Sequence, residues 1–378
     1  MLRCSPIASV EAIPVTIRRK PEIRLRTAYG LRDTTAVVLV RVRCEDGTEG
    51  VGEASGGPAW SGETQRISLA VIRDLLGPAV IGLDPSCIEQ LLQRMAGAVR
   101  HHPFAKAAIE MACFDLVGKA AGLPVYQLLG GKYRSDLPIR FVVTATEPER
   151  AAEIAQSFVQ QGFDAIKVKV GFERVSDVLR VRAVREAIGP KVRLTIDANT
   201  GWDVPTAIAA LRDLEDVDLL FAEQPVKQDD PRWMAEVRRS VSVPIMADES
   251  VFTPNDALRV LQAGAADILS VYPGKNGGML NTLKIAAIAE AAGALCSMGS
   301  NLELGVGSAA MAHVASASRT IASERYPGDI IGPLYHEDDV LLTPLDIRPG
   351  MVRVPEGPGL GVEVDWDKVE RYRPRDVR

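Results

Sequence analysis

Four stretches decide the fold: DAIKVKV at residues 164–170, VRLTIDAN at 192–199, LLFAEQP at 219–225 and VPIMADES at 243–250. Each contains apolar, often β-branched residues, as a buried strand does, and each carries charged or amide side chains in its second half. Amphipathic segments at 147–161, 174–188 and 282–292 lie around and between them. Strands that recur roughly every 25 to 30 residues with helices between them predict a parallel sheet.

The same alternation continues on both sides of these stretches. Further strands are expected at 137–144, 267–272 and 293–298, and a less clear eighth near 328–331. Seven or eight such units close most simply into a TIM-like barrel. An open doubly wound sheet is the alternative, but no GxGxxG motif follows the first strand of a βαβ unit, which argues against dinucleotide binding.

The N-terminal third has a different texture. Residues 36–42 alternate as a half-buried strand does, and the Asp46-Gly47 pair before the next β-prone run predicts a hairpin. Helical spacing of apolar residues follows from 64 to 122, and short strand-like pieces return at 351–365. We therefore expect an α+β unit before the barrel, with the tail packing back on it.

Composition narrows the class of protein. The 378 residues are 47% hydrophobic and 25% charged, which is ordinary globular composition. With 44 Lys and Arg against 49 Asp and Glu, the formal charge of −5 offers no bulk attraction to nucleic acid or to an anionic membrane. No apolar run has the length of a membrane span, and the five cysteines form no CxxC pair, so we predict a cytoplasmic protein with a small-molecule partner.

Carboxylates end three successive predicted strands, at Asp197, Glu223 and Asp248. Taken singly, each could be a helix N-cap or a loop residue. In a barrel, however, the carboxyl ends of the strands form one face, and three acids there repel one another unless a cation lies among them. Hard oxygen ligands of this kind predict a Mg²⁺ site, with Mn²⁺ also possible.

Lys167 and Lys169 are two residues apart, so on a strand both side chains point to one face, here the barrel mouth. Two neighbouring ammonium groups disfavour each other's protonation, which lowers the pKa of one of them and makes it a usable base. The alternative is an ordinary solvated KxK pair. A metal-bound carboxylate whose α-proton a lysine removes becomes an enediolate, so this chemistry is the one that the residues favour.

These residues identify the chain as resembling the enolase superfamily, in its muconate lactonizing enzyme subgroup. The resemblance extends essentially from end to end, and these motifs carry it: Lys167-Val168-Lys169, Asp197-Ala198-Asn199, Glu223-Gln224-Pro225, Ala247-Asp248-Glu249-Ser250, Lys275-Asn276-Gly277-Gly278, Lys106-Ala107-Ala108-Ile109-Glu110, Gly118-Lys119 and the stretch 123–131. It implies a modified (β/α)₇β barrel, residues 132–340, under an α+β capping domain, residues 1–131, with the segment 341–378 packing back on that cap.

The resemblance also implies roles for individual residues. Asp197, Glu223 and Asp248 would be the metal ligands, and Lys169 the acid or base, with Lys167 beside it in the catalytic group. Two cap loops, about 18–32 and 55–64, would set specificity. The substrate-binding residues implied in this way are Trp60 in the second loop, Asn199 after the third strand and Glu303 after the seventh.

One position departs from the family pattern. Most members of this subgroup carry a second catalytic lysine at the end of the sixth strand, where this chain has Tyr272. Lys275 corresponds to a loop residue that many relatives also carry, although Pro273-Gly274 leaves open whether this turn is redirected. A tyrosine with an ordinary pKa near 10 is a poor base but a good proton donor. Tyr272 therefore argues against a racemase or epimerase, which needs an acceptor on each face of the α-carbon.

We therefore predict a Mg²⁺-dependent enzyme that forms an enediolate from a small carboxylate, most simply a lactone-forming cycloisomerase of the muconate type. The alternative is a dehydratase of a hydroxy or imino acid, in which Lys169 or Tyr272 assists loss of hydroxide. A non-catalytic carboxylate-binding protein is a third possibility, which the intact lysines and acids disfavour. The resemblance also implies a homo-oligomer.

Overall fold

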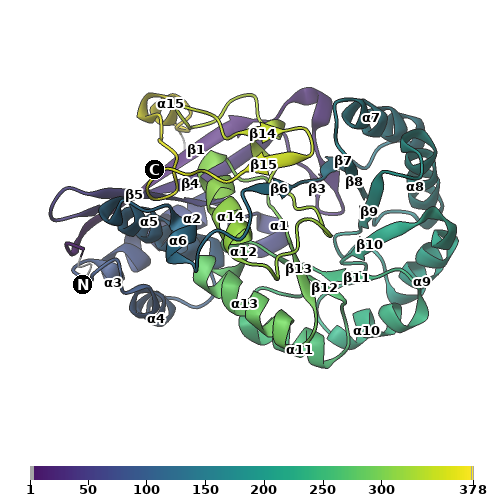
Figure 1. The fold of residues 1–378 in the computed structure, drawn as a ribbon, viewed down its shortest axis with the longest axis horizontal. Helices are drawn as coiled ribbons and strands as arrows, with labels where there is room; N and C mark the ends of the chain where they lie inside the picture. The colour runs from purple at the N-terminus through teal and green to yellow at the C-terminus, as the bar shows by residue number, and fades with distance from the viewer. Residues whose placement is uncertain (1–3, 376, 378) are drawn as a thin grey trace.

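The computed structural model describes residues 4–375 and 377, which form two bodies of secondary structure (Figure 1). The purple and blue body combines an antiparallel sheet with helices, and we call it the cap. The teal and green body is a ring of parallel strands surrounded by helices, which is the predicted barrel. The yellow C-terminal segment runs back over the cap.

The cap sheet has the order β1-β4-β5 and is antiparallel throughout. The predicted hairpin joins β4 to β5, and Gly47 takes a φ of 87° in its turn, where glycine has no steric penalty. The cap elements are β1 (Ile7–Arg18), η1 (Pro21–Ile23), β2 (Arg26–Thr27), β3 (Gly30–Leu31), β4 (Thr34–Cys44), β5 (Glu49–Ala54), α1 (Pro58–Ser61), α2 (Gln65–Val71), the π-helical η2 (Ile72–Leu76), α3 (Gly77–Val80), α4 (Ile88–Ala98), α5 (Pro103–Ala121) and α6 (Val125–Leu128).

Helix α5 packs directly on β5 because the facing strand positions are glycines. A Cβ at Gly50 or Gly52 would overlap the backbone carbonyl oxygens of Ala112 and Ala108 on α5. The helix is small-residue-rich and buried over most of its circumference, as its lack of a polar face predicts. This close contact makes α5 the central support of the cap.

The barrel strands pair in parallel in the order β13-β12-β11-β10-β9-β8-β7. Their bounds are β7 (Phe141–Val143), β8 (Ala165–Lys169), β9 (Arg193–Asp197), β10 (Leu219–Glu223), β11 (Ile245–Ala247), β12 (Ile268–Val271) and β13 (Leu295–Met298). The elements around them are α7 (Pro148–Gln160), α8 (Arg174–Ile188), α9 (Val204–Asp213), η3 (Glu215–Val217), α10 (Pro231–Ser240), α11 (Pro254–Gln262), α12 (Pro273–Asn276), α13 (Met279–Ala291), α14 (Gly305–Ala317) and η4 (Gly332–Tyr335).

Two of the predicted strands differ in the structure. The stretch 137–144 divides into β6 (Asp136–Pro138), which leaves the barrel, and β7; Pro138, which lacks an N–H, ends the first piece. The eighth strand is reduced to isolated parallel bridges, Cys296 with Ile321 and Ile139 with Gly328. These bridges still join β13 to β7 and close the ring.

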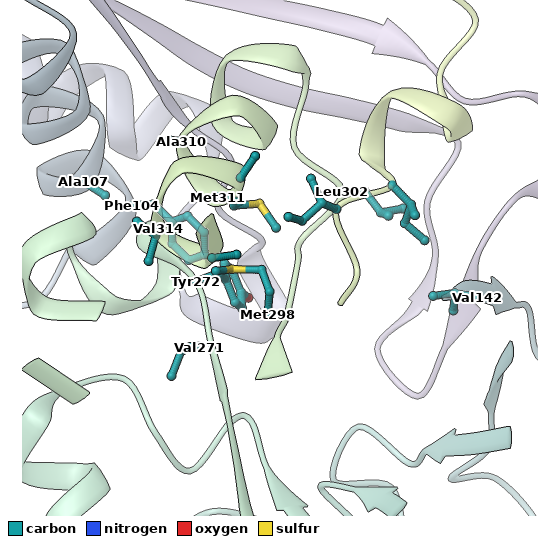
Figure 2. Close-up of a cluster of buried hydrophobic side chains, with 14 of the residues drawn as sticks. Phe104, Ala107, Val142, Val271, Tyr272, Met298, Leu302, Ala310, Met311 and Val314 are labelled. Atoms are coloured by element: carbon teal, nitrogen blue, oxygen red, sulfur yellow. The ribbon is translucent and has the colours of Figure 1, made fainter. Parts of the chain in front are cut away.

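The seam between cap and barrel is apolar. Figure 2 shows Phe104 and Ala107 of α5 beside Tyr272 and Met298 from the ends of two barrel strands. All four side chains are at most 1% exposed and belong to one continuous core cluster. The two bodies therefore share a core, which holds the cap loops in place over the strand ends.

The C-terminal segment contacts both bodies. Strand β14 (Ile347–Arg348) pairs with β15 (Met351–Arg353), which pairs with β6, while helix α15 (Trp366–Arg371) lies by the cap sheet, with Arg41 over the Trp366 ring. The predicted domain boundaries, between residues 131 and 132 and between residues 340 and 341, stay a proposal. Among the described residues, none of the helices combines the length and apolarity needed to cross a membrane.

Glu110 should be a main tie between the two bodies. Its carboxylate is fully buried on α5 and accepts hydrogen bonds from the backbone N–H groups of Met279 (2.7 Å) and Leu280 (2.9 Å) at the start of α13. Gly278, with a φ of 132°, leaves room for it because a Cβ there would overlap the carboxylate.

Replacing Glu110 by Ala leaves two buried N–H groups without an acceptor, so we expect the unfolding midpoint in urea to fall by the equivalent of about 2–4 kcal/mol. The matched control is Glu89→Ala. Glu89 lies on α4 and forms an exposed ion pair with Lys284 of α13, so its loss should change the midpoint little. Equal losses in both variants would contradict the assignment.

Candidate active site

The three predicted acids lie together at the mouth of the barrel. Asp197 ends β9 and pairs in register with Glu223, which ends β10, and Asp248 directly follows β11. Their exposed fractions are 2%, 3% and 7%. Hydrophobic strands with an acidic residue at or directly after their last position thus place three carboxylates side by side under the cap.

Both lysines of β8 reach these acids. Lys167 Nζ lies 2.9 Å from Glu223 Oε2 and 2.5 Å from an oxygen of Asp329. Lys169 Nζ lies 2.5 Å from Asp197 Oδ2 and donates to Asn199 Oδ1 at 2.9 Å. The predicted common face of the two lysines is therefore present, and both ammonium groups are paired rather than solvated.

The pKa of Lys167 is raised. Burial and the neighbouring Arg140 guanidinium lower that pKa, but the carboxylates of Asp329, Glu223 and Asp197 outweigh them and the net shift is upward. Burial raises the pKa of Glu223 to about 7, with Lys167 opposing and Asp197 adding to the shift.

Lys275 is a support for Asp248. Its fully buried Nζ lies 2.6 Å from Asp248 Oδ1 and also donates to the backbone oxygens of Asp248 (3.0 Å) and Ser270 (2.7 Å). All three ammonium hydrogens are used in this way. The turn through Pro273-Gly274 therefore directs Lys275 behind the acid, and it does not replace the missing lysine of the sixth strand.

A divalent cation fits the chemistry of this donor set. Asp197, Glu223 and Asp248 offer hard oxygen atoms from adjacent strands in a buried setting, which suits Mg²⁺ or Mn²⁺. Within the described residues, no three His, Cys, Asp or Glu side chains are placed closely enough to share an ion. Each of the three acids is instead paired with a lysine: Glu223 with Lys167, Asp197 with Lys169 and Asp248 with Lys275. Lys167 Nζ, within 4.0 Å of two of them, marks where positive charge is stabilised.

Glu249 is a site residue that the sequence argument missed. Its Oε1 accepts hydrogen bonds from Tyr29 Oη (3.2 Å), Trp60 Nε1 (3.2 Å) and Asn199 Nδ2 (3.1 Å). It therefore ties both cap loops to the barrel. The only sequence signal was its place beside Asp248 in the ADES stretch, where one acid had already been assigned.

Asp329 was also missed, since the eighth strand gave a weak pattern. It follows Gly328 at the bridge that closes the ring, and it accepts a hydrogen bond from Arg140 Nη2 at 2.8 Å as well as the contact with Lys167. Arg140 is fully buried. Together these residues extend the network of alternating charges to the far side of the barrel mouth.

Tyr272 follows β12 and is 1% exposed. Its ring centroid lies 6.0 Å from that of Trp60 and 6.3 Å from that of Phe104. Burial, followed by the charges of Asp248 and Glu303, raises its pKa well above 10, so the side chain is a neutral phenol. The aromatic neighbours pack against the Tyr272 ring on its apolar faces.

A cavity of about 70 Å³ lies between the strand ends and the cap loops. The predicted site residues on its wall are Trp60, Lys167, Lys169, Asp197, Asn199, Glu223 and Asp248. Tyr272 and Glu303 are not on this wall. Glu303 is buried just behind it, where it accepts hydrogen bonds from Ser300 Oγ (2.5 Å) and Ser55 Oγ (3.3 Å).

Comparison with known proteins defines the class. The description "Mandelate racemase / muconate lactonizing enzyme, N-terminal domain" matches residues 10–130, and "Enolase C-terminal domain-like" matches residues 149–368. The chain belongs to this family of the enolase superfamily, whose members are metal-dependent enzymes, and its muconate lactonizing enzyme-like subgroup is confirmed.

Individual relatives catalyse different reactions. The chain is 37% identical to L-Ala-D/L-Glu epimerase of Bacillus subtilis, over 93% of this chain and 94% of that one. The muconate lactonizing enzyme of Pseudomonas fluorescens with muconolactone is similar at 33% identity, covering 98% and 100%, with a TM-score of 0.94. The dipeptide epimerase of Enterococcus faecalis, solved with Mg and L-Leu-L-Tyr, is similar at 34% identity. The match covers 95% of this chain and 99% of that one, with a TM-score of 0.90. Family membership alone therefore does not select the reaction.

Adding MgCl₂ to protein freed of metal with EDTA should raise the thermal unfolding midpoint, because an ion that binds only the folded chain stabilises it. The gain is about 2.7 kcal/mol when Mg²⁺ is at 100 times its Kd. Glu223→Gln should lose most of this shift, whereas Glu186→Gln, an exposed position on α8, should keep it. A full shift in Glu223→Gln would show that the ion binds elsewhere.

Proposed function

We propose that this protein is a Mg²⁺-dependent, one-base enzyme that stabilises the enediolate of a small carboxylate, and that its reaction is a lactone-forming cycloisomerisation of the muconate type. The observation that carries the proposal is Tyr272. This neutral, buried phenol occupies the strand end at which an epimerase needs its second base.

The position of Tyr272 in the sheet supports this reading. In the order of the barrel strands, β12 is four places from β8, and four places is half the way around an eight-stranded ring. The strand ends that carry Lys169 and Tyr272 therefore lie on opposite sides of the barrel mouth. Lys275 Nζ lies 5.2 Å from the centroid of the Tyr272 ring, but its three hydrogens are donated to Asp248 and Ser270, so it is held as a charged support and not as a second base.

The remaining roles follow from the contacts. Asp197, Glu223 and Asp248 would hold Mg²⁺, or Mn²⁺ in its place, and the bound ion would offset the charge that develops on the substrate carboxylate. Lys169 is the proton donor, held at its position by Asp197 and Asn199. Lys167 adds positive charge near the same carboxylate.

In the reaction, one carboxylate oxygen of the diene diacid adds to a carbon of the diene and forms the ring C–O bond. The electron pair of the broken π bond moves to the other carboxyl end as an enolate. Lys169 then gives its proton to the α-carbon, so an N–H bond breaks and a C–H bond forms. Trp60, Asn199 and Glu303 are assigned to substrate positioning, the first two on the cavity wall and the third behind it. A homo-oligomer and a cytoplasmic location stay predictions from the sequence.

Proton NMR in D₂O with Mg²⁺ tests the proposal, with cis,cis-muconate, N-acyl amino acids, dipeptides and hydroxy or imino acids offered in turn. We expect muconolactone that carries a single deuterium. Deuterium exchange with inversion at the α-carbon of an amino acid derivative would overturn the one-base assignment. Conversion of a hydroxy acid to a keto product, with muconate unchanged, would establish a dehydratase instead.

Two variants separate the roles of the opposing residues. Lys169→Met should lower kcat by about 10²–10⁴, because it removes the proton donor. Tyr272→Phe keeps the shape of the ring and should leave kcat within about tenfold. A loss of two orders of magnitude in Tyr272→Phe would show that the phenol takes part in the chemistry.

A further inference from the structure

Two arginines of the cap line the same cavity as the strand-end acids. Arg19 directly follows β1 and is 4% exposed, and Arg32 directly follows β3. Burial, and then the charge of Arg32, lower the pKa of Arg19. The two guanidinium groups therefore lie near each other at the cap side of the cavity.

Among the described residues, neither Arg19, which is buried, nor Arg32, which is partly buried, forms an ion pair with a carboxylate. Two other buried arginines are neutralised: Arg140 by Asp329, and Arg180 by Asp177 at 2.6 Å. Arg19 donates from Nε to Thr35 Oγ1 at 2.9 Å, and within the described chain its two Nη groups donate to nothing. Arg32 Nη1 has only a long contact of 3.5 Å to Asn301 Oδ1.

Burying unpaired charge is costly, so this arrangement needs a reason. The charged forms of both side chains are disfavoured. Burial, followed by the charge of Arg32, lowers the pKa of Arg19 to about 10, and burial lowers the pKa of Arg32. An anion between the two groups would remove both penalties at once. Arginine is also the side chain whose planar group matches a carboxylate with two parallel hydrogen bonds.

The surroundings hold Arg19 in a fixed orientation. Its Nε–H donates to Thr35 Oγ1, and the Thr35 hydroxyl in turn lies 2.8 Å from Nε2 of the buried His336. Because Thr35 accepts from Arg19, its own hydrogen is free to bond that nitrogen. The hydrogen bonds from Arg19 to Thr35 and between Thr35 and His336 thus fix the Nε edge of the Arg19 guanidinium. Its Nη edge is left for a ligand.

The charge balance of the whole cavity points the same way. Its wall carries four cationic and four anionic side chains. The acids gather at the strand ends with the two lysines, while the two arginines stand on the cap loop. A divalent ion at the acids would add two positive charges, which a substrate with two carboxylates balances and a monocarboxylate does not.

We propose that Arg19 and Arg32 bind a second acidic group of the substrate, remote from the carboxylate at the strand ends, so that the enzyme selects dicarboxylates. The inference rests on the proposed function, since it concerns the same cavity. It assigns the selection of substrate to the cap and the chemistry to the barrel. The exposed arginines of the cap loop, Arg24 and Arg26, have no part in it.

The test uses two inert six-carbon acids, adipate and hexanoate, bound to the full-length protein in MgCl₂ and followed by isothermal titration calorimetry. The wild type should bind adipate at least tenfold more tightly than hexanoate. Arg32→Met and Arg19→Met should lose most of that preference while hexanoate binding stays within about twofold. The matched control is Arg18→Met, an exposed position next to Arg19, which should keep the preference.

A second variant reaches Arg32 without removing its charge. A Cβ at Gly57 would overlap the Arg32 guanidinium, and the φ of −139° at Gly57 suits any residue, so Gly57→Ala should displace the guanidinium and weaken adipate binding. Gly57→Ala also tests the subsite if Arg19→Met does not fold. Equal affinity of the wild type for both acids, or a full adipate preference in Arg32→Met and Gly57→Ala, would overturn the proposal.

The two proposals fail in different ways. If muconate is not converted but the adipate preference depends on Arg32, the dicarboxylate subsite stands and the reaction is different. If Arg32→Met converts muconate with an unchanged KM, the cycloisomerase assignment stands and the subsite falls.

Discussion

The compensation of charge at the barrel mouth is the constraint on which the rest of the structure depends. Acids and lysines at neighbouring strand ends are almost wholly buried, and such groups survive burial only when they are paired. Each ammonium group therefore lies against a carboxylate: Lys167 at Glu223, Lys169 at Asp197 and Lys275 at Asp248. Because the partners come from different strands, the register of the barrel and the position of the charges determine each other.

The cap completes this arrangement, and it does so through polar groups as well as through the shared apolar core. Glu249 collects donors from Tyr29 and Trp60, one from each cap loop, while Glu110 accepts from the start of a barrel helix. Loops that carry specificity are usually the mobile part of an enzyme. Here the buried Glu249 carboxylate accepts hydrogen bonds from both loops and from Asn199, so the positions of the loops are coupled to the barrel through direct contacts.

Most of the barrel could be predicted from the sequence because periodicity and strand-end acids are local signals. The strand ending in Glu223 was predicted with its observed bounds. Asp329 escaped because its strand exists only as isolated bridges, and Glu249 because two adjacent acids look alike in a sequence. Arg19 and Arg32 were missed for a different reason: whether a buried or partly buried charge has a partner is visible only in the folded chain.

Tyr272 shows how one substitution can redirect a shared scaffold. A lysine at this strand end would need an acid or a metal nearby to stay charged, or burial to hold it neutral as a base. The phenol needs neither, and it packs its ring against Trp60 and Phe104 instead. Under the proposed function, proton transfer is then confined to the Lys169 side. A reaction that asks for one proton on one face loses nothing by this exchange, whereas an epimerase loses half of its mechanism.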